Sequence, residues 1–167
     1  MRRILSDEID SDVGVETLFE RANKQWENGA LRSAFRLFLA AAKAGDTSSQ
    51  VNLGYFYSEG IGVKRNRAHS LYWNRRAYRR HEGCAATNIA VLFRDEGNVL
   101  QALAWFERAV ALGDNDARVE AAKLYLLKGK QPEAVRHLSL ATMAGRNDIT
   151  GAGLEEAQEI LRRLGQK

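Results

Sequence analysis

The sequence predicts an all-α protein of about four antiparallel helix pairs and a C-terminal capping helix. Three observations lead to this fold class. One amphipathic helical pattern recurs four times along the chain, and glycine follows at most of the expected helix ends. The 167 residues include a single proline, Pro132, and 45% of them are hydrophobic, which suits long helices and argues against a turn-rich β-sandwich.

The recurring pattern starts with a small residue, followed by bulky residues three and four positions later, small residues at positions seven and usually eight, and glycine at position eleven. These offsets lie on one face of an α-helix, and the closing glycine is typical of a left-handed C-terminal cap. The four copies begin 36, 32 and 32 residues apart, at Ala34, Ser70, Ala102 and Ala134. Each copy therefore predicts one helix.

A partner helix is expected before each of these four. The partner segments are rich in apolar and small residues and span about residues 15–28, 47–59, 84–95 and 115–128, ending near Gly29, Gly60, Gly97 and Gly129. One helix pair cannot bury its own apolar face, whereas neighbouring pairs in a stack bury a continuous core. The pattern therefore predicts a stack of helix pairs.

The predicted organisation is a single repeat domain over residues 15–167, preceded by an acidic segment, residues 1–14, that we expect to be flexible. The repeats span about residues 15–45, 46–83, 84–113 and 114–146. The capping helix is expected over residues 153–164, where apolar residues line one face and charged residues the other. Such a helix would cover the exposed end of the stack.

The second repeat contains the most specific motif of the chain. It reads Leu53-Gly54-Tyr55, then Gly60-Ile61-Gly62-Val63, Asn66, Ser70 and Trp73, and closes with Arg76-Ala77. This motif closely resembles the Sel-1-like repeat, a relative of the tetratricopeptide repeat. The resemblance implies a right-handed α-α superhelix and a protein-interaction role, because relatives act as adaptors or scaffolds in signalling, secretion, envelope biogenesis and bacterial toxin immunity. The full motif covers only about residues 45–83.

The other repeats depart from this motif. The third and fourth lack the Gly-x-Gly-Val loop, and their period of 32 residues is nearer the 34 residues of the tetratricopeptide repeat. In the second repeat, His81 stands where the pattern has glycine, and Glu82 and Gly83 follow. This last departure predicts a longer second helix in that repeat.

The first candidate site is a groove for a peptide. In such a stack the first helix of each pair lines the concave side, and Asn52 and Asn88 hold equivalent positions on two of these helices. With helices about 8–10 Å apart and ~3.3 Å per residue of extended ligand, the two amides would meet peptide groups about three residues apart. The candidate groove residues are Asn52, Tyr55, Thr87, Asn88, Val91 and Arg94. Alternatively, both asparagines bond to a neighbouring repeat or to water.

The second candidate site is a basic surface on the helix expected around residues 67–80. Its residues fall within about 100° of arc on the side away from the core, and they are Tyr72, Arg75, Arg76 and Arg79. Such a surface suits an acidic protein partner or the chain's own acidic segment first and nucleic-acid phosphate last. An ordinary solvated helix face is the alternative.

No group of residues in the sequence predicts catalysis. His69, His81 and His137 lie in different segments, and no pair of them has the spacing of helical zinc ligands. Cys84 lies at a helix start, where the helix dipole can lower a thiol pKa, but a lone cysteine among small residues more often has a packing role. We expect a protein that is not an enzyme and that has no metal and no cofactor.

Composition suggests where the protein works. The single cysteine cannot form an internal disulfide, no secretory signal is visible, and no run approaches the ~20 apolar residues of a membrane span. We therefore expect a cytoplasmic, bacterial adaptor or scaffold that binds a protein segment in its groove, with a cognate toxin or effector as one concrete partner. Binding of nucleic acid or an acidic partner through the basic helix is the alternative. The partner's identity and the oligomeric state are left open.

Overall fold

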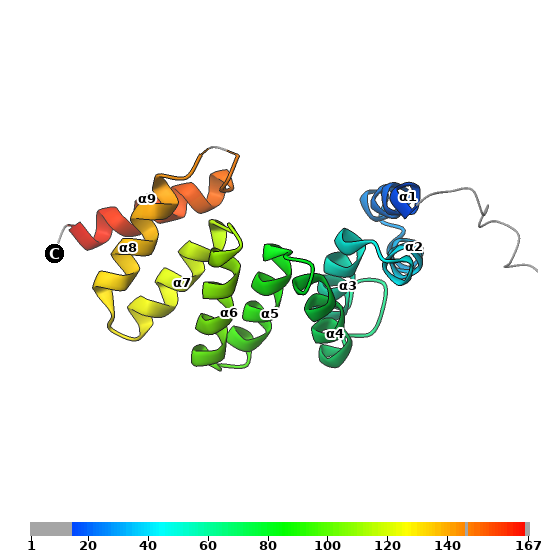
Figure 1. Cartoon of the computed structure of the whole chain (residues 1–167), viewed down its shortest axis with the longest axis horizontal. Coiled ribbons are helices and arrows are strands. Elements are labelled where there is room, and N and C mark those ends of the chain that lie inside the picture. Colours follow the sequence, from blue (N-terminus) through cyan, green and yellow to red (C-terminus); the bar gives the residue numbers. More distant parts are fainter. Residues whose placement is uncertain (1–14, 146, 166–167) are drawn as a thin grey trace, which may run out of the picture. The chain divides into compact units, whose positions relative to one another are not determined.

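The computed structural model describes residues 15–145 and 147–165, with side chains from Leu18 onward. The predicted acidic segment, residues 1–14, lies outside the described residues. Within those ranges the chain forms nine α-helices and no strand, which confirms the all-α fold class (Figure 1). In chain order the helices are α1 (Val15–Glu27), α2 (Leu31–Ala44), α3 (Thr47–Glu59), α4 (Arg67–Tyr78), α5 (Gly83–Asp95), α6 (Val99–Ala111), α7 (Asp116–Leu127), α8 (Gln131–Thr142) and α9 (Gly151–Gly165).

The turns between the helices of each pair follow the predicted positions. The glycines that end the first helices all adopt left-handed backbone conformations, with φ between 70° and 76° at Gly29, Gly60, Gly97 and Gly129. Glycine takes this conformation at little cost because it has no Cβ. The first helices α1, α3, α5 and α7 accordingly begin and end within one residue of the predicted segments.

The predicted extension of the second helix in the second repeat is wrong. Helix α4 ends at Tyr78, and His81 itself adopts the left-handed conformation that glycine takes elsewhere, with φ of 66°. Its N–H donates to the carbonyl oxygen of Tyr78 at 2.9 Å, which closes the turn. Histidine is one of the residue types that visits this region more often than most, so the chain turns here without a glycine.

The chain divides into two compact units, Met1–Ala77 and Tyr78–Lys167. The first unit contains α1 to α3 and nearly all of α4, and the second contains α5 to α9. The single continuous domain over residues 15–167 therefore stays a prediction.

Aromatic rings form the core of the first unit. The rings of Phe38 on α2 and Phe56 on α3 lie 5.3 Å apart, and the ring of Trp26 on α1 lies 5.0 Å from that of Phe56, both edge to face. Leu53 and Trp73 complete this cluster from α3 and α4. Burying a side chain such as Phe38 stabilises the fold by about 1.5–3 kcal/mol, so these rings contribute much of the unit's stability.

Helices α3 and α4 approach each other closely at Gly54. The Ser70 hydroxyl donates to the carbonyl oxygen of Gly54 at 2.7 Å, and the Asn74 amide donates to the carbonyl oxygen of Ser70 at 3.0 Å. A Cβ on Gly54 would overlap the buried side chain of Asn74. The Leu-Gly of the motif is therefore required for this helix contact, since any larger residue would push the two helices apart.

The second unit has two apolar clusters. Phe106 of α6 is fully buried in the first of them, among alanines of α5, α6 and α7. In the second, Leu138 of α8 lies among residues of α7, α8 and α9, including Ala157. The small residues allow the helices to approach closely, and α9 packs against α7 and α8 as expected of a capping helix.

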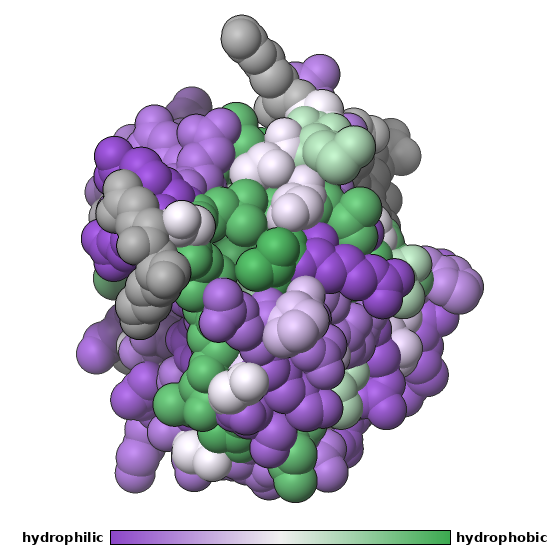
Figure 2. All heavy atoms as spheres, turned by 90° about the vertical axis from the view of Figure 1, so that its left-hand side faces the viewer, coloured by the Kyte–Doolittle hydropathy of each residue, from purple (hydrophilic) through white to green (hydrophobic). Residues whose placement is uncertain are grey.

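Apolar surface remains at the end of the second unit formed by α8 and α9. Figure 2 shows the side of the molecule that lies at the left of Figure 1, where these two helices are found. Green apolar side chains gather near the centre of this face, with purple polar side chains around them. Leu140 of α8 and Met143, which follows its last residue, are exposed on the surface of this unit. The capping helix therefore does not give the unit a wholly polar end.

Candidate functional site

Two of the predicted groove residues, Asn52 and Tyr55, lie on α3 in the first unit. Asn52 is half-buried, and its side chain forms no hydrogen bond within the described part of the chain. Tyr55 is 41% exposed, and its ring lies 6.2 Å from the ring of Trp26 on α1. Asn52 and Tyr55 are three residues apart and so share one helix face. The first helices of this unit thus present an amide without an internal partner near an exposed aromatic ring.

Four predicted groove residues lie on α5 in the second unit, and the first three, Thr87, Asn88 and Val91, all contact other residues of the protein. The Thr87 hydroxyl donates to Asp114 Oδ2 at 2.6 Å, and Val91 packs against the cluster around Phe106. Asn88 is half-buried and interacts with other parts of the protein. Asn52 and Asn88 belong to different units, so their predicted spacing along an extended ligand stays a prediction.

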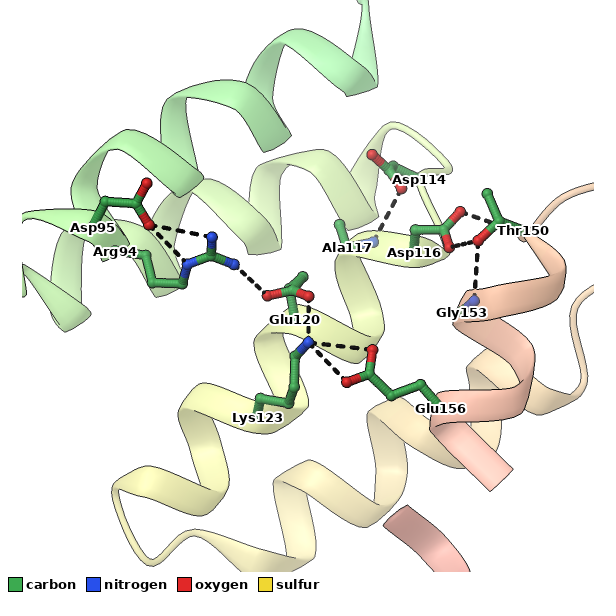
Figure 3. Close-up of polar contacts among 10 residues, drawn as sticks. All are labelled: Arg94, Asp95, Asp114, Asp116, Ala117, Glu120, Lys123, Thr150, Gly153 and Glu156. Carbon is green, nitrogen blue, oxygen red and sulfur yellow. Dashed lines mark hydrogen bonds and ion pairs between the residues drawn. The ribbon is translucent and has the colours of Figure 1, made fainter. Parts of the chain in front are cut away.

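The last predicted groove residue, Arg94, belongs to an ion-pair chain across three helices (Figure 3). Its guanidinium contacts Asp95 on its own helix at 3.2 Å and Glu120 of α7 at 2.7 Å. Glu120 also pairs with Lys123, whose ammonium lies 3.0 Å from a carboxylate oxygen of Glu156 on α9. We name Arg94, Glu120, Lys123 and Glu156 the charge chain. It links the two first helices of this unit to its capping helix.

The charge chain keeps its central cation charged. Burial alone would lower the pKa of Lys123, but hydrogen bonds to Glu120 and Glu156 outweigh it and hold that pKa above its ordinary value. Sequence reasoning named Arg94 but missed Lys123 and Glu156. These two residues are 33 positions apart in the chain, and no local pattern indicates that they meet.

A polar contact beside the charge chain orients the start of α9. Asp116, at the start of α7, accepts from the Thr150 hydroxyl at 2.5 Å and from the Thr150 backbone N–H at 3.1 Å (Figure 3). Thr150 Oγ1 in turn accepts from the N–H of Gly153 at 3.0 Å, as a residue preceding a helix commonly does. Asp116 closely approaches Gly153, so a side chain there would displace the carboxylate.

Three of the four residues of the predicted basic surface come together on α4. Tyr72 is 52% exposed, Arg75 is exposed, and the guanidinium of Arg76 lies 5.7 Å from the centre of the Trp73 ring. The fourth, Arg79, follows the last residue of α4 and belongs to the second unit. The α4 part therefore forms a surface by itself.

A buried titratable cluster in the second unit was not predicted. His137 of α8 is buried, with Nε2 3.2 Å from Glu107 Oε1 of α6, and Tyr125 of α7 donates to the same carboxylate oxygen at 2.8 Å. Burial lowers the pKa of His137 more than Glu107 raises it. Burial and the bond to Glu107 raise the pKa of Tyr125 to about 12. The sequence pattern shows His137 only as a core position of the fourth repeat.

Possible metal ligands and the single cysteine of the described residues bear on whether this protein catalyses a reaction. Among them, no three side chains of histidine, cysteine, aspartate or glutamate are placed to hold a metal ion together. Partial burial and the nearby Asp114 and Glu82 raise the pKa of Cys84, which is opposite to the lowering that a helix dipole would cause. As for membranes, the helices that the structure describes are all too short or too polar to span one.

The model of the Sel1 repeat family matches the chain in three places, residues 31–46, 47–81 and 92–114. The matches include the Gly60-x-Gly62-Val63 loop, its close contact with the α2 start at Leu31, and the Gly54 contact between α3 and α4. They also reach residues 92–114, where sequence reasoning found only a plainer helix pattern. None of the curated proteins matches the chain significantly.

Solved structures share the fold. A Sel1 repeat protein from Oxalobacter formigenes is 24% identical, with a TM-score of 0.69 over 82% of this chain and 61% of its own. A protective antigen of uropathogenic Escherichia coli with the same repeat fold is 18% identical, with a TM-score of 0.73 over 92% of this chain and 35% of its own. A thermophilic tetratricopeptide-repeat protein from Thermus thermophilus is 19% identical, with a TM-score of 0.65 over 89% of this chain and 82% of its own. The chain thus spans less than two thirds of the first two proteins.

Proposed function

The chain is a Sel1-like repeat protein of the tetratricopeptide-like superfamily, and from that premise we propose that it is a non-catalytic scaffold binding a segment of a partner protein. Repeat proteins of this kind are generally protein-interaction scaffolds. The proposed binding surface is the face formed by the first helices of the pairs. In its most specific form, the proposal takes a cognate toxin or effector in the bacterial cytoplasm as the partner.

The observation that carries the proposal is the pair Asn52 and Tyr55 on α3. A half-buried amide without an internal partner offers one donor and one acceptor, the same two functions that a peptide group of an extended ligand needs. An exposed tyrosine adds a large contact area at a low cost in conformational entropy. Backbone recognition beside an aromatic contact suits a peptide better than a small polar ligand.

The other proposed groove residues lie on α5 in the second unit. Thr87 and Arg94 are bonded to acidic side chains of their own unit, so a ligand would have to compete for them. Val91 and Asn88 lie on the same helix as these two, and they complete the proposed surface on α5. The affinity is therefore expected to depend more on Asn52 and Tyr55 than on Thr87 or Arg94.

The test begins with peptides selected from a display library against the whole chain. Isothermal titration calorimetry then compares the wild type with Asn52→Ala and Tyr55→Ala, and with Arg36→Ala, an exposed residue on the second helix of its pair, as control. We expect Asn52→Ala and Tyr55→Ala each to weaken binding about fivefold to tenfold, because a hydrogen bond contributes about 0.5–1.5 kcal/mol. Arg36→Ala should bind like the wild type.

Equal affinity of the wild type and a folded Asn52→Ala/Tyr55→Ala variant for every selected peptide would remove this surface from consideration. Loss of binding in Thr87→Ala alone, with both α3 variants unaffected, would move the site to the second unit. Circular dichroism melting of each variant separates lost contacts from lost folding.

A further inference from the structure

Positive charge is concentrated in one part of the first unit. The stretch Gly60–Ala77 contains five lysines and arginines and no aspartate or glutamate. Over residues 18–77 the sequence has ten basic and four acidic residues, although the whole chain has a net charge of only +4. The positive charge of residues 18–77 is thus far from balanced by the acidic residues within that range, and an anionic segment is the natural complement.

The exposed side of α4 combines this charge with an apolar hollow. Ala68, His69 and Tyr72 line a hollow of about 280 Å³, and Arg75 and Arg76 follow one turn later on the same side. The Trp73 ring lies against the guanidinium of Arg76 and helps to orient it. We name these five lining and flanking residues, Ala68, His69, Tyr72, Arg75 and Arg76, the α4 surface. It suits a segment in which carboxylates flank one apolar side chain.

The chain contains such a segment before α1. Residues 7–12 read Asp-Glu-Ile-Asp-Ser-Asp, with four carboxylates around the single apolar side chain of Ile9. We propose that residues 7–12 of this chain dock on the α4 surface, with carboxylates at Arg75 and Arg76 and Ile9 in the hollow. This contact covers the α4 surface until an acidic partner displaces it, and it does not depend on the proposed peptide site.

The length of the segment allows this contact. The chain from Ile9 to Val15 spans up to about 20 Å at ~3.3 Å per residue, about twice the radius of gyration of roughly 10 Å for a unit of sixty residues. Tethering gives a segment an effective concentration on the order of 1 mM, so even a dissociation constant of about 0.1 mM would keep the surface largely occupied. Exposed ion pairs are weak and screened by salt, so the contact should open at high ionic strength.

The test uses the full chain and a fluorescein-labelled peptide with the sequence of residues 4–13. Peptide binding at 50 mM salt is measured by fluorescence anisotropy for the wild type and for a full-length Asp7→Asn/Glu8→Gln/Asp10→Asn/Asp12→Asn variant. Because that variant cannot cover its own α4 surface, we expect it to bind the peptide about tenfold more tightly than the wild type does. Adding Arg75→Glu/Arg76→Glu to it should abolish binding.

Lys24→Glu/Lys43→Glu, added to the same neutralised chain, is the matched control. It changes the net charge by the same amount as Arg75→Glu/Arg76→Glu. Lys24 and Lys43 also lie in the last turns of their helices, α1 and α2, as Arg75 and Arg76 do in α4. Peptide binding should survive in this control, and Arg75→Gln/Arg76→Gln serves if the reversed pair does not fold. Equal peptide affinity of the wild type and the neutralised chain would refute the contact. The contact would also be refuted if Arg75→Glu/Arg76→Glu and Lys24→Glu/Lys43→Glu weakened peptide binding equally. Tighter binding of a single-stranded oligonucleotide than of the peptide would refute it too.

Discussion

Single residues decide how closely the helices of this protein pack. Gly54 is the clearest case, because the side chain of Asn74 on the next helix occupies the space that a side chain on Gly54 would need. Gly62 plays a similar role in the loop after α3, where a Cβ would overlap the backbone of Leu31. The motif glycines therefore serve close contacts between elements and not only turns.

His137 makes the stability of the second unit depend on pH. Burial lowers its pKa in the folded state, so below about pH 6.5 the unfolded chain takes up a proton that the folded chain resists. Stability from this residue is present above that pH and is lost as the pH falls, by up to about 1.4 kcal/mol per pH unit. Urea unfolding between pH 7.5 and 5 should show a steeper decline for the wild type than for His137→Gln.

Charged groups around His137 also act on its pKa and so change the size of this pH effect. Glu107 favours the protonated ring, whereas Arg118 and Arg136 oppose it, and Tyr125 donates to Glu107 beside it. His69→Gln, which changes an exposed ring stacked on Tyr57, is the control and should keep the wild-type pH dependence. If the free energy of unfolding fell equally with pH for the wild type and His137→Gln, the folded state would accept a proton on His137 without cost.

At the scale of elements, the charge chain ties α5 and α7 to α9. Glu120 bridges two cations, so Glu120→Gln leaves both Arg94 and Lys123 without their shared carboxylate. We expect a loss of about 1 kcal/mol in the free energy of unfolding at low salt, at the upper end for partly exposed pairs, because several charges form one network. Urea unfolding at 50 mM and at 1 M salt should show the difference shrinking as salt screens it.

Glu133→Gln is the matched control for this prediction. Glu133 pairs with Lys130 at 3.7 Å in a more exposed position, where an ion pair contributes little. Glu133→Gln should lower the free energy of unfolding by less than about 0.5 kcal/mol at both salt concentrations. An equally small effect of Glu120→Gln would mean that the charge chain does not hold the first helices and α9 together.

At the scale of the whole molecule, each unit has its own core. Phe106 is fully buried in the second unit, so Phe106→Ala should cost about 3–5 kcal/mol. Repeat stability is close to a sum of local and nearest-neighbour contributions, so the loss should concentrate near the substitution. Amide hydrogen exchange should accelerate about a hundredfold or more in α5 to α8 and much less in α1 to α3.

Leu100→Ala is the control, because this leucine of α6 is largely exposed and should leave exchange nearly unchanged. A uniform acceleration over all helices in Phe106→Ala would instead show that the two units unfold as one. That result would support the single domain that the repeat pattern predicts.

The sequence by itself determined the helices, their pairing and the family. Helix period, glycine turns and the Leu53-Gly54 and Gly60-x-Gly62-Val63 motifs depend on residues close together in the chain, and local geometry follows from them. The end of the second helix in the second repeat was predicted wrongly because that prediction also used only the local pattern. The pattern expects glycine where the chain turns, whereas His81 adopts the left-handed conformation there.

Only the tertiary structure decided which candidate side chains are engaged. Thr87 and Arg94 looked as available as Asn52, yet their partners Asp114 and Glu120 lie 27 and 26 residues away and reach them across packed helices. Glu156, which pairs with Lys123, and Glu107, which contacts His137, likewise come from other helices. Such contacts depend on how the helices rotate and approach each other, which is set by packing in the core and not by local sequence pattern.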